Sequence, residues 1–419
     1  MQIRLPYGKT VLTVELPDGL AVDVIEAPLV PSAADPLREV TDALERLLGG
    51  AAWDEHLQAR TVGIAINDKT RPVPHDQLLP PLLKKLERLG FAPETVTFYV
   101  AVGTHPPMPQ DEFGMILPEW ILKNYRVVSH DCESEDLLVF LGETSRGTPV
   151  WTNRHFQESG LKIVVGNIEP HQFAGFSGGV KTAAVGLCGL ETININHALL
   201  HHPDSQVGVY ENNPVRQDVE EIGEKIGIQI ALNAVLNQER QIVHALAGEP
   251  RAVMLAGIPL SRQVCQAAVP EPYALVIASP GGHPKDINVY QAQKGLAHAA
   301  LVTRAGGTII LAAACPEGTG SPHYEDWVLG MQSSQDVLDR FHAEGFRVGP
   351  HKAFLIARDS SKARLMFVSE LEPQLAQSLL LSPAKDLQSA VDLALNTLLS
   401  GERIGILPHA SSTIPFLKE

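Results

Sequence analysis

Residues 61–67 read TVGIAIN, an apolar run rich in β-branched side chains that leads directly into the polar segment DKTRPVP at residues 68–74. Such a run is typical of a strand buried on both faces of a sheet. Residues 76–89 (DQLLPPLLKKLERL) repeat apolar side chains at helical spacing, and residues 95–102 form the next apolar run. Strand, helix and strand in this order predict a parallel sheet with a crossover helix. Residues 161–165 (LKIVV) predict a further strand.

A second series of the same kind begins near residue 273. Its apolar runs alternate with segments of helical period, which again favours parallel strands joined by helices. In chain order the series comprises YALVIASPGG (273–282), a helix at 291–304, a strand at 308–313, RLMFVSE (364–370), a helix at 386–399 and RIGILPHA (403–410).

Residues 245–265 lie between the two series and have helical content without a strand pattern, so we expect the domain boundary there. We predict an N-terminal cofactor-binding and catalytic domain at residues 1–262 and a C-terminal Rossmann-like domain at residues 263–419. The predicted fold class is α/β, with two α/β domains whose mostly parallel sheets face a central cleft, because ligands of open α/β sheets bind beyond the carboxyl ends of the strands.

Composition limits the classes of partner. The formal net charge of -15 opposes non-specific binding to nucleic acid or to an anionic membrane, since both would be repelled. The first residues lack the basic start and apolar core of a signal peptide, and no window is apolar over the length of a membrane span. The four cysteines are far apart and form no CxxC pair, which disfavours disulfides and a cysteine zinc site. A cytoplasmic location is the expectation.

Asp68 and Arg71 lie in the polar segment after the first predicted strand. A guanidinium holds a carboxylate through two parallel hydrogen bonds, and a neighbouring aspartate can steady the guanidinium or bind a ribose hydroxyl. Taken alone, such a segment is more often a proline-rich surface turn with an ion pair.

His105 lies at the carboxyl end of the next strand, within GTHPP at residues 103–107. The two prolines make a stiff turn that would hold the imidazole in one orientation. Histidine is the commonest general acid or base, because its unperturbed pKa lies near neutrality. The alternative is a histidine that only caps the strand through a backbone hydrogen bond.

The segment EPHQFAGFSGGVK at residues 169–181 carries the most candidate groups. Ser177, Gly178 and Gly179 precede a predicted helix, and consecutive backbone N–H groups at such a position bind phosphate. Lys181 adds a positive charge and an amine suited to covalent attachment. The competing interpretation is a glycine-rich connector with a solvated lysine.

Two further groups of side chains follow. His197 lies near His201 and His202, and imidazole suits nickel, copper, iron and zinc, although no HExxH accompanies it. A polar loop is the favoured interpretation of His201 and His202. In the second domain, the YQAQK segment (290–294) begins a helix and can present several side chains on one side. Those side chains would offer donors to an anionic substrate, whereas a solvated helix face is the more frequent alternative.

Taken together, DKTRPVP, GTHPP, EPHQFAGFSGGVK, the pair Asn196 and His197, and YQAQK resemble the nickel-pincer nucleotide-dependent lactate racemase family, in this order and at closely similar spacing. Five separated motifs are far more specific than any one of them. The resemblance implies an isomerase, a racemase or epimerase of a 2-hydroxy acid that is lactate-like, malate-like or a sugar acid. It also implies hydride transfer to and from the nickel-pincer nucleotide.

The resemblance assigns expected roles to individual residues. Lys181 would bind the cofactor covalently, a pyridinium-3,5-bisthiocarboxylic acid mononucleotide that holds nickel, and His197 would be the protein ligand of the metal. His105 and His171 would be the acid/base pair. Other residues would contact the nucleotide, namely Asp68, Thr70, Ser177, Gly178 and Gly179, or the substrate, namely Arg71, Tyr290, Gln291 and Lys294. Cofactor-synthesis enzymes would be partners in the cell.

Two other functions fit part of the pattern. A nicotinamide-dependent 2-hydroxyacid oxidoreductase would carry GxGxxG after the first strand, and the sequence has none there. A non-catalytic nucleotide-binding protein would keep Lys181 and the glycine turn but would have no use for His105 and His171. The presence of both histidines favours catalysis.

Overall fold

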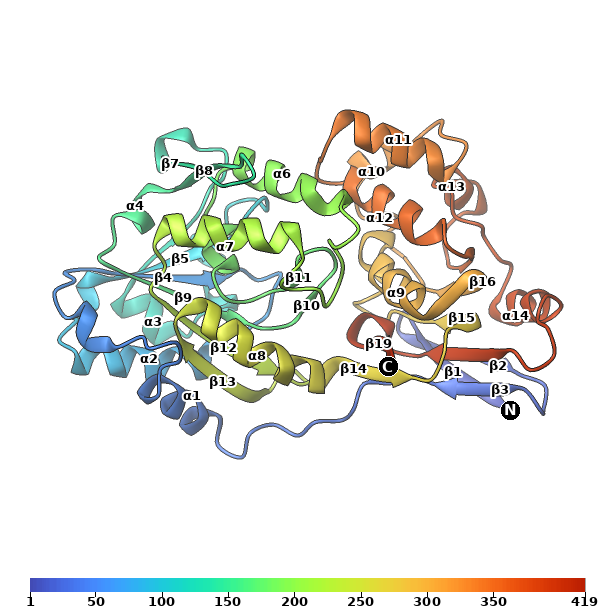
Figure 1. Ribbon diagram of the computed structural model, residues 1–419, viewed down its shortest axis with the longest axis horizontal. Coiled ribbons are helices and arrows are strands. Elements are labelled where there is room, and N and C mark those ends of the chain that lie inside the picture. Colours follow the sequence, from blue (N-terminus) through green and yellow to red (C-terminus); the bar gives the residue numbers. More distant parts are fainter. Residues whose placement is uncertain (419) are drawn as a thin grey trace. The chain divides into compact units, whose positions relative to one another are not determined.

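The computed structural model describes residues 1–418, which form two units (Figure 1). Unit 2 comprises Leu29–Val264, and unit 1 comprises Met1–Pro28 together with the chain from Cys265 onward. The boundary expected after residue 262 therefore differs by two residues from the one found. The first 28 residues, assigned from the sequence to the N-terminal domain, belong to unit 1 instead, because β3 (Ala21–Val24) pairs with β18 (Arg403–Leu407).

Unit 2 is built on one six-stranded sheet in the order β13-β12-β9-β4-β5-β6. All neighbouring strands are parallel except β12 and β13. The strands predicted at residues 61–67, 95–102 and 161–165 are confirmed. In the structure the six strands are β4 (Val62–Asn67), β5 (Val96–Ala101), β6 (Arg126–Ser129), β9 (Leu161–Asn167), β12 (Ile230–Leu236) and β13 (Ile242–Gly248).

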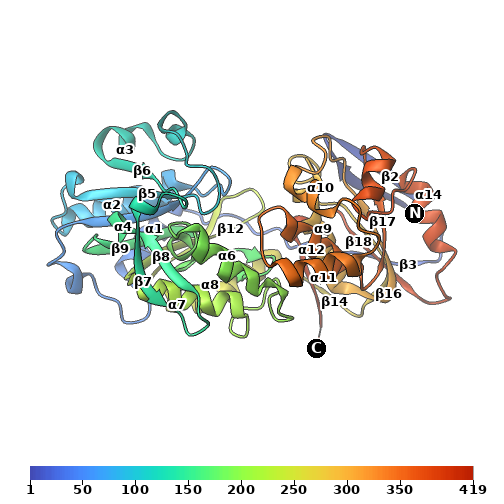
Figure 2. The same cartoon turned by 90° about the horizontal axis from the view of Figure 1, so that it is seen from above.

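Helices cover both faces of this sheet (Figure 2). Successive strand residues point to opposite faces, so Ile64 and Ile66 enter one apolar core and Ala65 enters the other. The first core is closed by α1 (Pro36–Glu45), α2 (His75–Arg88) and α3 (Glu119–Asn124). The second is closed by α5 (Lys181–Ala184), α6 (Leu190–Ala198), α7 (Pro214–Ile226) and α8 (Pro250–Cys265).

Smaller elements complete unit 2. The hairpin β7 (Leu138–Glu143) and β8 (Pro149–Asn153) precedes α4 (Arg154–Gln157), and β10 (Pro170–His171) pairs with β11 (Gly175–Phe176). Two elements differ from expectation. Strand β13 includes residues 245–248, where no strand was predicted, because its small side chains gain their strand geometry from pairing with β12. The helix expected near Lys181 has only four residues.

Unit 1 is built on a parallel sheet in the order β17-β16-β15-β18-β3, which confirms the second α/β series. The remaining strands of this sheet are β15 (Tyr273–Ala278), β16 (Thr303–Ala312) and β17 (Arg364–Val368). One face packs on α14 (Leu387–Leu395) and on the antiparallel pair β1 (Gln2–Tyr7) and β2 (Thr10–Glu15).

Helix α9 (Val289–Val302) packs on β15 and β16 and also on α12 (Pro350–Ser360). The other helices of unit 1 are α10 (Pro322–Val328), α11 (Ser334–Glu344) and α13 (Pro373–Ser378), and β14 (Gln266–Val269) pairs with β19 (Ile414–Leu417). Within residues 1–418, no helix has both the length and the apolar character needed to cross a membrane.

Gly175 gives a direct test of close packing in unit 2. Its φ is +71°, and a Cβ atom there would lie 1.7 Å from the carbonyl oxygen of Val209. Gly208 also has a positive φ, +78°, but no described atom lies within 4 Å of its added Cβ apart from its chain neighbours. Gly208→Ala should cost about 1–2 kcal/mol for the left-handed backbone. Gly175→Ala should cost about 1–3 kcal/mol more, because it also overpacks the site.

Chemical denaturation of the two variants measures this difference in the free energy of unfolding. Equal losses for Gly175→Ala and Gly208→Ala would contradict the close contact with Val209.

Candidate active site

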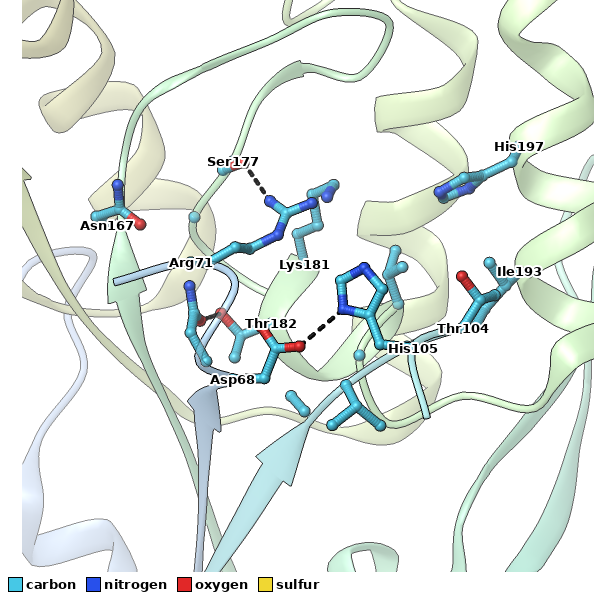
Figure 3. Close-up of a pocket in the computed structure, with 17 residues that line it drawn as sticks. Asp68, Arg71, Thr104, His105, Asn167, Ser177, Lys181, Thr182, Ile193 and His197 are labelled. Atoms are coloured by element: carbon cyan, nitrogen blue, oxygen red, sulfur yellow. Dashed lines mark hydrogen bonds and ion pairs between the residues drawn. The ribbon is translucent and has the colours of Figure 1, made fainter. Parts of the chain in front are cut away.

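A cavity of about 110 Å³ lies in unit 2 at the carboxyl ends of β9, β4 and β5 (Figure 3). These strands are parallel neighbours, so the segments that follow them meet at one edge of the sheet. Many of the predicted site residues line the cavity, namely Asp68, Arg71, His105, Ser177, Gly178, Lys181 and His197.

His105 is fixed by a carboxylate. Its Nδ1 lies 2.7 Å from Oδ2 of Asp68, whose other oxygen accepts the Thr70 hydroxyl at 2.7 Å. Burial opposes the charge on Asp68, but the bonds from His105 and Thr70 prevail and hold the pKa of that carboxyl below its ordinary value. An ionised carboxylate requires a proton on Nδ1, so a neutral His105 ring carries its lone pair on Nε2. A neutral His105 ring can therefore accept a proton at Nε2.

Lys181 is the first residue of α5 and is buried in the cavity wall. Burial, followed by the positive charges of Arg71 and Arg216, holds the pKa of the Lys181 ammonium well below its ordinary value. The neutral amine is the nucleophilic form of lysine. Lys181 therefore has the environment of a reactive amine rather than of a solvated surface charge.

His197 lies near the end of α6 and faces the same cavity (Figure 3). Burial, together with the charges of Lys181 and Arg71, lowers the pKa of His197 to about 3. Its ring is therefore neutral at physiological pH, which is the form that binds metals.

A chain of hydrogen bonds fixes the orientation of His197. The amide nitrogen of Asn196 donates to Oδ2 of Asp218 at 2.9 Å, so the amide oxygen of Asn196 is the acceptor that meets Nδ1 of His197 at 2.9 Å. Nδ1 carries the proton, and the lone pair lies on Nε2. Carboxylates and amides that set the tautomer in this way are the usual support of a metal-binding histidine.

The glycine turn differs from the sequence-based expectation. The backbone N–H of Ser177 donates to the carbonyl of Glu169 at 2.7 Å, and that of Gly179 donates to Oδ1 of Asn233 at 2.7 Å. The run of free N–H groups expected for a phosphate is therefore wrong for Ser177 and Gly179. The Ser177 hydroxyl instead accepts a hydrogen bond from Arg71 at 3.2 Å.

Arg216 stabilises this turn by hydrogen bonds to its carbonyl groups. It is fully buried in α7, donates to the carbonyls of Phe176 and Gly178 at 3.1 Å, and pairs with Glu220 at 2.6 Å. A guanidinium can make these bonds at once because its five N–H donors lie in one plane. Arg216 thus holds the cavity wall and places a positive charge near Lys181.

His171 does not line the cavity among the described residues, but its ring contacts that of Phe173 at 4.7 Å between centroids. Phe173 in turn contacts His197 at 5.0 Å. Nδ1 of His171 accepts the backbone N–H of Ala174 at 3.2 Å, so the proton of the neutral ring lies on Nε2. His105 and His171 therefore have opposite tautomers.

The remaining predicted residues lie apart from the cavity lining. Thr70 donates a hydrogen bond to Asp68, which lines the cavity. Gly179 belongs to the glycine turn, whose Gly178 lines the cavity, and its N–H donates to Asn233. Tyr290, Gln291 and Lys294 belong to α9 in unit 1, where Nζ of Lys294 donates to Oε1 of Gln291 at 2.9 Å.

Sequence reasoning missed several residues that shape the cavity. Asn67 and Asn167 end strands β4 and β9, and a polar side chain closing an apolar run was an available signal. Thr182 also lines the cavity and lies beside Asn67. Arg216 lies far away in the sequence within an ordinary helical pattern, which gave no signal.

The Asp68 bonds predict a pH-dependent contribution to stability. Asp68→Asn keeps the shape of the side chain but removes its charge, and it should lower the free energy of unfolding at pH 5 by about 1.5–3 kcal/mol. Folding lowers the pKa of Asp68 below 3.8, so its stabilisation is complete above that value and is lost as pH falls through the lower folded-state pKa. The difference between wild type and variant in urea denaturation should therefore shrink below about pH 4. A difference that is unchanged at about pH 3 would contradict the charged pairing.

Known proteins with the same organisation are lactate racemases. Residues 7–208 match the lactate racemase N-terminal domain, and residues 269–414 match the lactate racemase C-terminal domain. The chain is 28% identical to the lactate racemase of Thermoanaerobacterium thermosaccharolyticum, with 98% of each chain covered. It is 27% identical to that of Lactiplantibacillus plantarum, with 98% of this chain and 99% of the relative covered.

Solved structures agree. The lactate racemase apoprotein of T. thermosaccharolyticum superposes with a TM-score of 0.89 at 28% identity, and all of both chains is covered. A protein of Thermotoga maritima shares the fold, with a TM-score of 0.65 at 19% identity over 93% of this chain and 100% of the other. From the two matched domains and the full-length similarity, the chain belongs to the lactate racemase family and is an isomerase, a racemase.

Proposed function

We propose that this racemase interconverts the two antipodes of a 2-hydroxy acid such as lactate, with a nickel-pincer nucleotide in the cavity of unit 2. One observation carries the proposal. The His105–Asp68 pair, the buried amine of Lys181 with its lowered pKa, and the neutral imidazole of His197 line the same cavity. The lactate racemases that the chain resembles support lactate as the type of substrate.

The donor set fits such a cofactor. Within residues 1–418, no three His, Cys, Asp or Glu side chains gather as metal ligands, so a nickel ion at His197 would take its other ligands from the cofactor. His197 would contribute Nε2, and Lys181 would form the covalent link through its amine. When bound, a nickel-pincer nucleotide supplies an acceptor for the hydrogen that leaves the substrate α-carbon as hydride.

His105 would take the hydroxyl proton of the substrate at Nε2. The charged ring that results is stabilised by the carboxylate of Asp68 at 2.7 Å, which already holds Nδ1. His105 would serve one antipode in this way and return the proton to the oxygen when that antipode forms again, whereas His171 would serve the other. A buried Asp68 thus orients the base and stabilises its charged form.

His171 would act from a different starting state. Its neutral ring presents Nε2–H, a donor suited to the substrate oxygen. To accept a proton at Nε2, the ring must first turn away from the backbone N–H of Ala174. The two histidines therefore form an acid/base pair in which His105 is the ready base.

Substrate binding would rely on positive charge. Arg71 lines the cavity and can hold the carboxylate while the keto acid rotates. We propose Tyr290, Gln291 and Lys294 of α9 as further substrate contacts, together with Asp68, Thr70, Ser177, Gly178 and Gly179 for the nucleotide. For Gly179 the contact would be through its Cα, since its N–H is bonded to Asn233.

The cofactor is tested on protein coexpressed with nickel-pincer synthesis enzymes. Intact-protein mass should show an added nucleotide, and metal analysis should show nickel, because the lowered pKa of the Lys181 amine favours covalent attachment. Lys181→Ala should lose the mass adduct. Lys162→Met is the matched control, since Lys162 is also buried but bonds to the carbonyl of Ser159 outside the cavity.

Wild-type protein without adduct or nickel under these conditions would contradict the cofactor assignment. An adduct that persists in Lys181→Ala would contradict the attachment site.

The acid/base pair is tested by His105→Gln and His171→Gln. Each should lower kcat/KM for racemisation about 10²–10⁴-fold and leave the mass adduct in place. The loss should be the same in both directions, because the two antipodes have equal free energy in solution. Polarimetry with each antipode measures it, and His155→Gln, on the exposed surface of α4, is the control. Unchanged turnover in either active-site variant would refute the role of that histidine.

A further inference from the structure

The amide that meets His197 belongs to a hydrogen-bond network that continues through α7 to the hairpin β7–β8. Asp218, on α7, is fully buried and accepts the amide nitrogen of Asn196 at 2.9 Å. The same carboxylate accepts the Thr144 hydroxyl at 2.6 Å and the Thr148 hydroxyl at 2.8 Å. Both threonines lie in the turn that joins the two strands of the hairpin. We call Thr144, Thr148, Asp218 and Asn196 the hairpin network.

The hairpin network fixes which end of the Asn196 amide faces His197. The amide nitrogen donates to the carbonyl of Val215 at 3.1 Å as well as to Asp218. A carbonyl and a carboxylate only accept hydrogen bonds, so a turned amide would place its oxygen against two acceptors. The oxygen of Asn196 therefore stays on the side of Nδ1 of His197, where it accepts the ring proton at 2.9 Å. Removal of the Asp218 charge would weaken this choice of orientation.

The hairpin network also brings a carboxylate to bear on His197 without direct contact. Two hydroxyls and one amide donate to Asp218, and hydrogen bonds from neutral groups stabilise a buried carboxylate without cancelling its charge. In a buried chain of hydrogen bonds each bond polarises the next, so the amide oxygen of Asn196 becomes a stronger acceptor. A stronger acceptor at Nδ1 makes Nε2 of the imidazole a more basic metal ligand.

We propose that Asp218 is a positioning residue for nickel: through Asn196 it holds His197 with Nε2 as the ligand atom, which makes the hairpin β7–β8 part of the metal site. This inference rests on the proposed function, because it concerns the metal at His197. Among the described residues that line the cavity, Asp218 is absent, so it acts only through the amide.

The tautomer is tested on the full-length apoprotein, without nickel or nucleotide. Long-range proton–nitrogen NMR spectra of protein with isotope-labelled histidine distinguish the two neutral tautomers, and His197→Gln identifies the signals of His197. Wild type should carry the proton on Nδ1. Asp218→Asn keeps the shape of the side chain, and the tautomer with the proton on Nε2 should appear, because a turned Asn196 amide then meets one acceptor fewer. A proton on Nε2 in wild type, or an unchanged tautomer in Asp218→Asn, would overturn the inference and leave the proposed function standing.

Nickel retention tests the same residue on the cofactor-loaded protein. Asp218→Asn should release nickel to a chelator about 10- to 100-fold faster than wild type, since the groups that support a metal ligand usually contribute that much to affinity. Asn196→Ala should also release nickel faster, and adding Asp218→Asn to it should have little further effect, because Asp218 acts through that amide. Glu221→Gln is the matched control, since Glu221 also joins α7 to the hairpin turn, but through exposed bonds to Ser145.

The double variant separates positioning from a general loss of packing. Equal release rates for wild type and Asp218→Asn, or effects of the two substitutions that simply add, would overturn the inference while the proposed function stands. Wild-type protein that takes up no nickel during coexpression would instead refute the proposed function, and the inference would fall with it.

Discussion

The parallel pairing of β4 with both β9 and β5 is the constraint on which the site depends. Parallel neighbours end at the same edge, so the residues after each strand meet although they are far apart in the sequence. Asp68 follows β4, His105 follows β5, and the turn at Ser177 follows β9. Without this pairing, the Asp68–His105 bond and the Arg71–Ser177 bond could not form, because each joins separate strand ends.

Burial and neighbouring positive charges lower the pKa values of two basic groups in the cavity, Lys181 and His197. Arg71, Arg216, Lys181 and His197 lie close enough for their charges to interact, in a site partly removed from water. Like charges and burial favour loss of protons, and the groups with lower intrinsic pKa lose them first. The pKa of Lys181 is therefore held well below its ordinary value, and the pKa of His197 falls to about 3, so that its ring is neutral. The same electrostatics therefore favours the unprotonated form of both side chains.

Sequence patterns predicted the strands, because a strand depends on residues that are close together in the chain. TVGIAIN and LKIVV are strands because β-branched residues pack well on a pleated surface, and the polar groups after them follow as a consequence. The sequence did not predict which residues far apart in the chain would bond to each other. The Asn196–Asp218 bond spans 22 residues, the Arg216–Gly178 bonds span 38, and the Asp23–Arg403 pair that places residues 1–28 in unit 1 spans 380. The SGG pattern predicted free N–H groups, but Asn233, 54 residues away, takes that of Gly179.

The chain as a whole is negative, so attraction for an anion must come from individual basic side chains. The chain carries a net charge of -15, which would repel an anionic substrate at long range. Salt screens that repulsion beyond about 8 Å at physiological ionic strength, whereas buried charges are screened much less. Arg71, which lines the cavity of unit 2, acts within that range. A small anion that reaches Arg71 therefore experiences local attraction despite the negative net charge of the chain.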